Sequence, residues 1–360
     1  MRFHIGGPLQ ADHGAVAIHG KGATTIAIDT HNLIRAVAQR VLRTKYVVAS
    51  VRRARLSVDR LVYRRGYSLE ELRELLRNLG FSRGRVVWVQ SSWNDFFNLR
   101  AKPTDVIALM RDLLGPDGTL VMPAFPLSPD PAKVLQIDSE PSSAGLLTEI
   151  FRRTPGVKRS IHLTSSVCAL GPAADFLVRD HHLDVYPWGP NTPYCRLMDV
   201  DARLVTLGLG RFVTNLTPLH AVECLLHDEL PFFQRVFDGT IKYRWRRNSG
   251  ETGDHEYRRR GGRLSMRGYG QHFPSDLYIE LRQSNLTAFA TDAKKVIDGA
   301  IALARRGITI FAEPKWEADL FVPCKAATVL PARTLPAEVQ VAHGQRYPLL
   351  ARDISTRRQP

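Results

Sequence analysis

The sequence lacks the features that mark membrane, secreted and disulfide-rich proteins. It has no uninterrupted run of about 18 apolar residues, so we expect no transmembrane helix. Residues 1–8 are not followed by an apolar block with a small-residue cleavage site, so we expect no secretory signal and a cytoplasmic location. Four cysteines lie too far apart for a redox motif or a zinc ribbon. We therefore expect buried free thiols at Cys168, Cys195, Cys224 and Cys324.

Phosphate-binding and metal-binding motifs are also incomplete. Gly20-Lys21 is followed by glycine instead of serine or threonine, which excludes a Walker loop, and the 208–210 segment lacks the third glycine of a dinucleotide fingerprint. There is no His-Glu-x-x-His sequence, and His181-His182 has no third ligand nearby in the chain. We therefore expect no metal site.

Positive charge is concentrated at the two ends of the chain. The 360 residues hold 50 Lys+Arg against 35 Asp+Glu, with 44% hydrophobic residues, which is a composition that folds. Residues 1–66 contain 12 basic and 3 acidic side chains and residues 331–360 contain 5 and 2, whereas 67–330 contain 33 and 30. This pattern predicts a basic N-terminal extension over 1–66, a main domain over 67–330 and a tail over 331–360.

The sequence leaves the role of the N-terminal extension open. Apolar residues recur at helical spacing over 31–43, with arginines between them, which predicts a basic amphipathic helix. Three interpretations stay open: a solvated helix packed on the main domain or on a partner subunit of a homo-oligomer, a peripheral contact with an anionic surface, or disorder.

From Ser68 onward, helices and strands alternate in the pattern of an α/β protein. Ser68 and Glu71 form a capping-box sequence at the start of a helix. We expect helices over 68–80, 104–114, 144–152, 219–226 and 290–305, and strands over 85–90, 118–123, 165–170 and 204–207. Such alternation predicts a mixed, partly parallel central sheet flanked by helices.

Residues 241–263 interrupt this alternation. Basic and aromatic residues alternate on both sides of a turn at 248–250, which predicts a basic β-hairpin. The hairpin is interpreted as a two-faced surface element or as a cationic wall for an anionic ligand. No nucleic-acid-binding motif accompanies it, so we expect no specific nucleic-acid partner.

Two short polar segments could carry chemistry. Residues 159–166 precede an apolar strand, and residues 217–223 open a helix that places His220 and Glu223 three residues apart on one face. A histidine and a carboxylate from such segments form a general base, because the carboxylate fixes the imidazole tautomer and stabilises the imidazolium. Each segment alone is weak evidence.

Taken in order, five segments resemble the aminoglycoside 3-N-acetyltransferase family. The resemblance runs from about residue 67 to 314 and preserves both order and approximate spacing. The segments are Val89-Gln90-Ser91-Ser92, the 113–125 stretch that ends in Pro123-Ala124-Phe125, Arg159-Ser160-Ile161-His162, the 188–193 stretch that begins Trp188-Gly189-Pro190, and Leu207-Gly208 leading to Thr217, His220 and Glu223.

The resemblance implies an α/β fold distinct from the commoner acetyltransferase fold, and transfer of an acetyl group from acetyl-CoA to an amine. In the family the histidine of the Arg-Ser-x-His segment acts with the carboxylate of the Thr-x-x-His-x-x-Glu segment. Here these residues are His162, as general base, and Glu223, with His220 beside them in the site. A base that titrates near neutral pH suits deprotonation of an ammonium group.

The resemblance also implies which residues bind the two substrates, and it places backbone amides near Ser91-Ser92 around the thioester oxyanion. The expected acetyl-CoA contacts are Gln90, Ser91, Ser92, Arg159, Ser160 and Ser166. The expected acceptor contacts are Phe125, Trp188 and Thr217. Two positions depart from the family pattern: Gln90 replaces a histidine, and Leu163 replaces a proline. Either the substrate has changed or the activity is reduced, and we favour a change of substrate because His162, Ser166, His220 and Glu223 are all present.

The net charge of the main domain indicates which class of amine it attracts as the acceptor. An enzyme that captures polycationic aminoglycosides benefits from surplus acidic residues, and this domain is nearly neutral. We therefore expect a small-molecule amine, either an amino sugar or another biosynthetic amine, as the acceptor. The alternatives are an aminoglycoside resistance enzyme, transfer of a different acyl group, and a catalytically impaired homologue that acts as a binding or scaffold protein.

Overall fold

The first strand lies in the middle of the central sheet, and its alternate residues pack in two different hydrophobic cores. In the computed structural model, which describes residues 57–210, 215–265, 268–326 and 333–336, β1 spans Val86–Ser91. Trp88 packs in the core on one face, while Val87 and Val89 pack in the core on the other. Because both faces are covered, the strand is continuously apolar, as is usual for parallel sheets.

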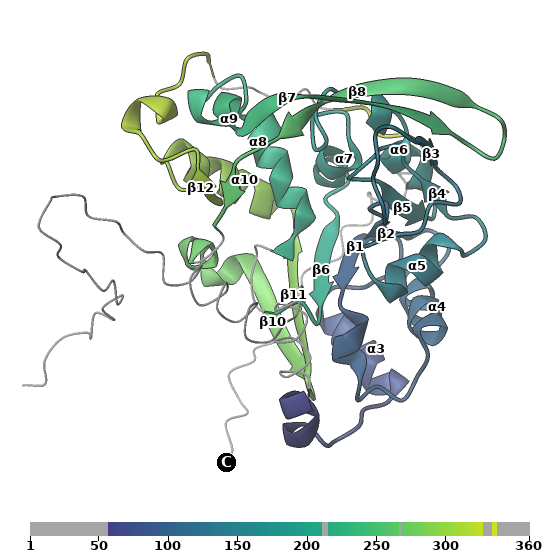
Figure 1. Cartoon of the computed structure of the whole chain (residues 1–360). Coiled ribbons are helices and arrows are strands. Elements are labelled where there is room, and N and C mark those ends of the chain that lie inside the picture. Colours follow the sequence, from purple (N-terminus) through teal and green to yellow (C-terminus); the bar gives the residue numbers. More distant parts are fainter. Residues whose placement is uncertain (1–56, 211–214, 266–267, 327–332, 337–360) are drawn as a thin grey trace, which may run out of the picture. The chain divides into compact units, whose positions relative to one another are not determined.

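Seven strands form the central sheet of the unit Tyr63–Pro360 (Figure 1). β1 pairs in parallel with both β2 and β6, and the outer strands pair antiparallel. The predicted mixed, partly parallel sheet is therefore confirmed. In spatial order the strands are β10 (Tyr278–Gln283), β11 (Leu286–Asp292), β6 (Arg203–Leu207), β1, β2 (Thr119–Pro123), β5 (Val167–Leu170) and β4 (Lys158–Arg159).

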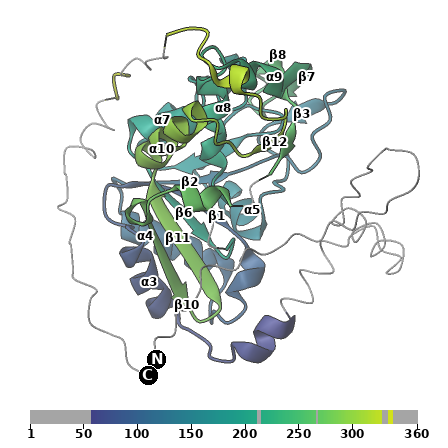
Figure 2. The ribbon, with the colours of Figure 1, turned by 90° about the vertical axis from the view of Figure 1, so that its left-hand side faces the viewer.

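Helices cover both faces of this sheet (Figure 2). On one face lie α3 (Leu69–Asn78), α4 (Pro103–Leu114) and α5 (Leu146–Arg152). On the other lie α6 (Ala174–Val178), α7 (Pro193–Asp199), α8 (Ala221–Leu225), α9 (Pro231–Val236) and α10 (Ala293–Arg305). Short 3-10 turns are η1 (Trp93–Phe96), η2 (His181–Leu183), η4 (Thr217–His220), η5 (Tyr269–His272), η6 (Ser275–Leu277) and η7 (Ala318–Phe321).

The predicted hairpin is present and covers a small core of its own. β7 (Phe237–Arg246) pairs antiparallel with β8 (Thr252–Arg260) and in parallel with β3 (Val134–Gln136). Tyr243, Trp245 and Tyr257 point inward and pack with Ile161 and Leu163. The hairpin therefore lies over the segment that contains His162. A further small pair joins β9 (Arg263–Leu264) to β12 (Phe311–Glu313).

The differences from the sequence prediction have local causes. The helix expected from residue 290 begins at Ala293, because residues 290–292 complete β11. The helix expected over 219–226 is divided into η4 and α8. Strands β10 and β11 were not predicted. The basic helix expected over 31–43, and most of the N-terminal extension and tail, lie outside the described residues.

Two expectations concern the cysteines and membrane spans. All four cysteines are free thiols; Cys168, Cys195 and Cys224 are buried as expected, whereas Cys324 is exposed. Within the described ranges, none of the helices has the length and apolar character needed to cross a bilayer.

The capping box at Ser68 gives a first prediction. The Ser68 hydroxyl accepts from the Glu71 amide at 3.2 Å, and the Glu71 carboxylate accepts from the Ser68 amide at 2.8 Å. Ser68→Ala leaves the Glu71 amide without its acceptor, so we expect urea denaturation to show a free energy of unfolding lower by about 1 kcal/mol. Ser82→Ala, in the following loop, is the matched control. Equal losses in the two variants would contradict the capping role.

Candidate functional site

Polar residues gather at the carboxyl ends of the parallel strands β1 and β6. Gln90 and Ser91 end β1, and β6 ends at Leu207, after which the chain continues to η4 and α8. Crevices at the carboxyl ends of parallel strands are the usual binding sites of open α/β sheets. This edge is therefore where the candidate site is built.

A buried carboxylate and a histidine form the centre of the site. Nδ1 of His220 lies 2.5 Å from Oε1 of Glu223, and Glu223 is only 1% exposed. A contact this short needs a hydrogen between the two atoms, because the carboxylate oxygen can only accept. Nδ1 of His220 therefore donates to Glu223. In the form of the ring that carries one proton, this leaves the lone pair of Nε2 free to accept another.

Gln90 anchors the turn that carries His220. Its Oε1 accepts from the Thr217 amide at 2.8 Å and from Nε1 of Trp88 at 3.0 Å, and its Nε2 donates to the Thr217 hydroxyl at 3.0 Å. Both ends of the Gln90 amide are thus bound within the protein. These bonds give Gln90 a positioning role with Thr217 as its partner, and its predicted acetyl-CoA contact stays a prediction.

An aromatic ring and an arginine complete the site. The ring of Trp188 lies 4.8 Å from the ring of His220. Arg260, from the end of β8, places Nη1 3.2 Å from Nδ1 of His220 and 3.6 Å from Oε1 of Glu223, and its guanidinium lies 5.2 Å over Trp188. Arg260 was not predicted as a site residue; its only signal in the sequence was membership of the basic hairpin.

His162 lies in different surroundings from those predicted. Its Nδ1 accepts from the amides of Thr164 and Ser165, both at 3.2 Å. Because an amide N–H only donates, Nδ1 keeps its lone pair, and the proton of the neutral ring is on Nε2. Glu223 binds His220, and the hydrogen bonds of His162 remain within its own loop. The predicted action of His162 as a base supported by Glu223 stays a prediction.

His162 belongs to a cluster of histidines under the hairpin. Its ring stacks on His181 with centroids 4.7 Å apart and lies 4.5 Å from the ring of Tyr257. Burial lowers the pKa of His162 well below its ordinary value, the pKa of His181 to about 3, and the pKa of His255 to about 4. These rings are therefore neutral at pH 7.

Three residues expected to bind acetyl-CoA have structural partners instead. Arg159 is 5% exposed and donates to the carbonyls of Ala124, Ile137 and Glu140. The Ser160 hydroxyl contacts Nδ1 of His181 at 2.9 Å, and the Ser166 hydroxyl donates to the carbonyl of His162. These hydrogen bonds give the three residues structural roles inside the fold, and their predicted acetyl-CoA contacts stay predictions.

The turn after β1 differs in part from its prediction. The Ser92 hydroxyl donates to Asp95 at 2.5 Å, and the Ser92 amide donates to the carbonyl of Leu207 at 2.9 Å. That amide is therefore unavailable to a thioester oxyanion. Ser91 and Phe125 are half-buried near the carboxyl ends of β1 and β2, and their predicted contacts stay predictions.

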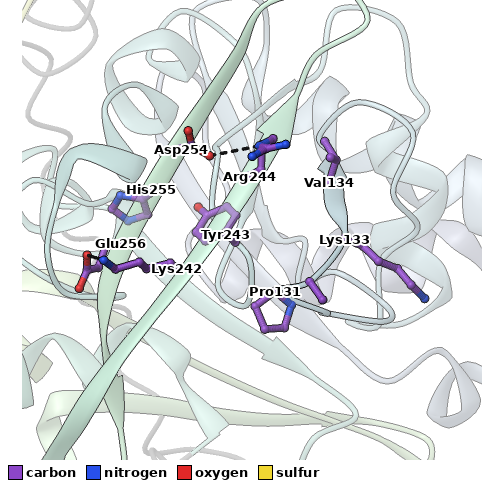
Figure 3. Close-up of a pocket in the computed structure, with 10 residues that line it drawn as sticks. Pro131, Lys133, Val134, Lys242, Tyr243, Arg244, Asp254, His255 and Glu256 are labelled. Carbon is purple, nitrogen blue, oxygen red and sulfur yellow. Dashed lines mark hydrogen bonds and ion pairs between the residues drawn. The ribbon is translucent and has the colours of Figure 1, made fainter.

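Two of the cations on the outer face of the hairpin are paired with carboxylates. A cavity of about 540 Å³ lies between the hairpin and residues 131–134 (Figure 3). Beside it Lys242 pairs with Glu256 at 3.1 Å and Arg244 pairs with Asp254 at 3.3 Å, as the dashed lines show. These pairs favour the two-faced surface hairpin over a cationic wall.

Comparisons with known proteins agree in one family. The sequence profile described as aminoglycoside 3-N-acetyltransferase matches residues 88–303. Aminoglycoside N(3)-acetyltransferase IV of Salmonella sp is 35% identical over 156 residues, which cover 43% of this chain and 58% of that protein. Aminoglycoside N(3)-acetyltransferase VIII of Streptomyces fradiae is 33% identical over 167 residues, which cover 41% and 57%. The match thus spans less than two thirds of these relatives' length.

Solved structures superpose on a larger fraction of this chain than the sequence alignments cover. Aminoglycoside acetyltransferase AAC(3)-IVa, as the apoenzyme, superposes with a TM-score of 0.57 at 25% identity, covering 69% of this chain and 93% of that chain. The AAC-IIIb binary complex with CoASH superposes with a TM-score of 0.57 at 22% identity, covering 69% and 99%. The second likeness shows the fold alone.

The buried histidines predict a pH-dependent stability. The ordinary pKa of histidine is about 6.5, and that of folded His181 is about 3, so the unfolded chain binds this proton first as pH falls. The stability that this group contributes is complete above about pH 6.5 and is lost as pH falls toward 3, by at most about 1.4 kcal/mol per pH unit. Urea denaturation between pH 7 and 5 measures it.

Substitution of a buried and of an exposed histidine separates the contribution of the buried cluster to the pH dependence. His181→Gln should show a smaller loss of unfolding free energy between pH 7 and 5 than the wild type, whereas His272→Gln, at an exposed position, should follow the wild type. A wild-type free energy that does not change over this range would contradict burial of neutral histidines.

Proposed function

The chain belongs to the aminoglycoside 3-N-acetyltransferase family, and from this premise we propose that it transfers the acetyl group of acetyl-CoA to a primary amine. The observation that carries the proposal is the buried Glu223–His220 pair, whose carboxylate takes the Nδ1 hydrogen and leaves Nε2 as a base. The CoASH complex of AAC-IIIb supports acetyl-CoA as the co-substrate.

His220 acts on the acceptor in this proposal. Its Nε2 takes a proton from the ammonium group, and the neutral nitrogen attacks the carbonyl carbon of the thioester. The C–N bond forms, the C–S bond breaks, and the CoA thiolate leaves. The imidazolium gives its proton to the thiolate, and the second proton of the attacking nitrogen passes to solvent, so that one proton is released per amide formed. Glu223 stabilises the imidazolium while it exists, because its carboxylate lies against Nδ1.

We assign the base to His220 in place of His162. The two amides that donate to Nδ1 of His162 put its proton on Nε2, and burial lowers its pKa well below the ordinary value. A ring in this state donates a hydrogen bond and does not accept a proton near pH 7. His162 therefore supports the fold beneath the hairpin, or donates to a group that enters there.

The acceptor we propose is an amino sugar or another biosynthetic amine. Residues 67–330 hold 33 basic and 30 acidic side chains, so the main domain has no surplus of negative charge with which to attract a polycation. An aminoglycoside is the second candidate, and the names of the relatives favour it: another neighbouring structure is AAC(3)-IVa in complex with a gentamicin. Release of CoA thiol in the presence of each amine distinguishes the two.

The base assignment gives a direct prediction. His220→Ala should lower kcat by about 10²- to 10⁴-fold, since general-base catalysis contributes this much, and Glu223→Gln should lower it less. Thiol release measures the rates, and circular dichroism verifies that each variant is folded. His162→Gln is the comparison, with a smaller effect than His220→Ala. Near wild-type turnover by folded His220→Ala would refute the role of His220.

A further inference from the structure

We propose that Arg260 selects acceptors that carry an anionic group, a carboxylate or a phosphate ester, close to the reacting amine. The inference rests on the proposed function, because it assigns a substrate class to the same site. It starts from a feature that acetyl transfer itself does not require: a guanidinium placed directly against the catalytic carboxylate and histidine.

The position of Arg260 is fixed by three contacts. Its Nη1 lies 3.2 Å from Nδ1 of His220 and 3.6 Å from Oε1 of Glu223, and its Cζ lies 5.2 Å from the centroid of Trp188. Glu223 takes the Nδ1 hydrogen of His220, so Arg260 acts on the pair through its charge. Its place at the end of β8 is set by the pairing of the hairpin.

The guanidinium keeps donors for a ligand. Across the described ranges no hydrogen bond is made by Nε or Nη2 of Arg260, and its side chain is 24% exposed, in contrast to the 2% of Glu223. The planar fork of an arginine matches the oxygens of a carboxylate or a phosphate. The exposed part of Arg260 is therefore suited to an anion that arrives at the site.

The charge of the site argues against a cationic acceptor. Arg260 compensates the charge of Glu223, so a second ammonium group near the reacting amine gains no attraction from the carboxylate and meets the guanidinium. An acceptor with an anionic group is attracted to the site, because its anionic group binds Arg260 while its ammonium group approaches His220.

The anion belongs to the acceptor and not to CoA. In the proposed reaction the amine meets Nε2 of His220, and the guanidinium of Arg260 lies against Nδ1 of the same ring. Only an anionic substituent on an atom near the attacking nitrogen spans the short distance between these two positions. The phosphates of CoA are separated from the thioester by the whole pantetheine arm, so they lie away from this position.

The test compares amines of different charge on three variants. Thiol release from acetyl-CoA is measured with glucosamine 1-phosphate, muramic acid, glucosamine and gentamicin. The first two carry a phosphate or a carboxylate on the carbon next to the amine-bearing carbon, glucosamine carries no anion, and gentamicin is a polycation. The variants are Arg260→Gln, Arg260→Lys and the matched control Arg259→Gln, which removes the same charge from the adjacent residue. Arg259 is exposed and pairs with Asp238.

For the wild type we expect kcat/KM with the better anionic amine to exceed that with glucosamine by about 10- to 100-fold, the value of one charge-assisted hydrogen-bonded contact. The readout is the ratio of kcat/KM for the anionic amine to that for glucosamine, because loss of Arg260 also changes the surroundings of Glu223 and can lower both rates. Arg260→Gln should bring this ratio close to one, Arg260→Lys should restore part of it, and Arg259→Gln should keep the wild-type ratio. The phosphate and carboxylate arms identify which anion is recognised.

Two results overturn the inference in distinguishable ways. Acetylation of glucosamine or gentamicin with no preference for the anionic amines, unchanged in Arg260→Gln, refutes the role of Arg260 and leaves acetyl transfer in place. Absence of thiol release with every amine refutes both the acetyl transfer and the inference built on it.

Discussion

The contact between Glu223 and Nδ1 of His220, 2.5 Å long and almost wholly buried, is the interaction on which the account depends. A buried carboxylate is costly unless it is paired, and here the imidazole and Arg260 both pair with it. The geometry of the pair depends in turn on Gln90, whose amide fixes the start of η4 against the end of β1. The sheet thus determines the orientation of the base.

Two histidine environments in one fold show how neighbours decide the function of a ring. His220 has an acceptor at Nδ1, so its proton is held there and Nε2 is free. His162 has amide donors at Nδ1, so its proton is on Nε2, and burial beside His181 lowers its pKa. The first ring is suited to proton transfer, and the second to a neutral packed core.

Local patterns in the sequence predicted most of the fold, because the capping box at Ser68 and the apolar run of β1 are determined by residues close in the chain. The motif that contains His220 and Glu223 was recognised for the same reason: its two residues share one helix face. Spacing along the chain does not report which side chains meet across the sheet, so it could not show that Glu223 forms its hydrogen bond with His220 and not with His162. Arg260 lies forty residues after His220 and reaches it only when β7 and β8 pair.

A double-mutant cycle on His220 and Glu223 tests the central claim most directly. Thiol release from acetyl-CoA is measured for His220→Ala, Glu223→Gln and the double variant, each with the best amine acceptor. If the carboxylate acts through the imidazole, the second substitution adds little, and the double variant turns over at about the rate of His220→Ala. Losses that multiply, so that the double variant is slower by the product of the two single effects, would contradict the coupling of the pair.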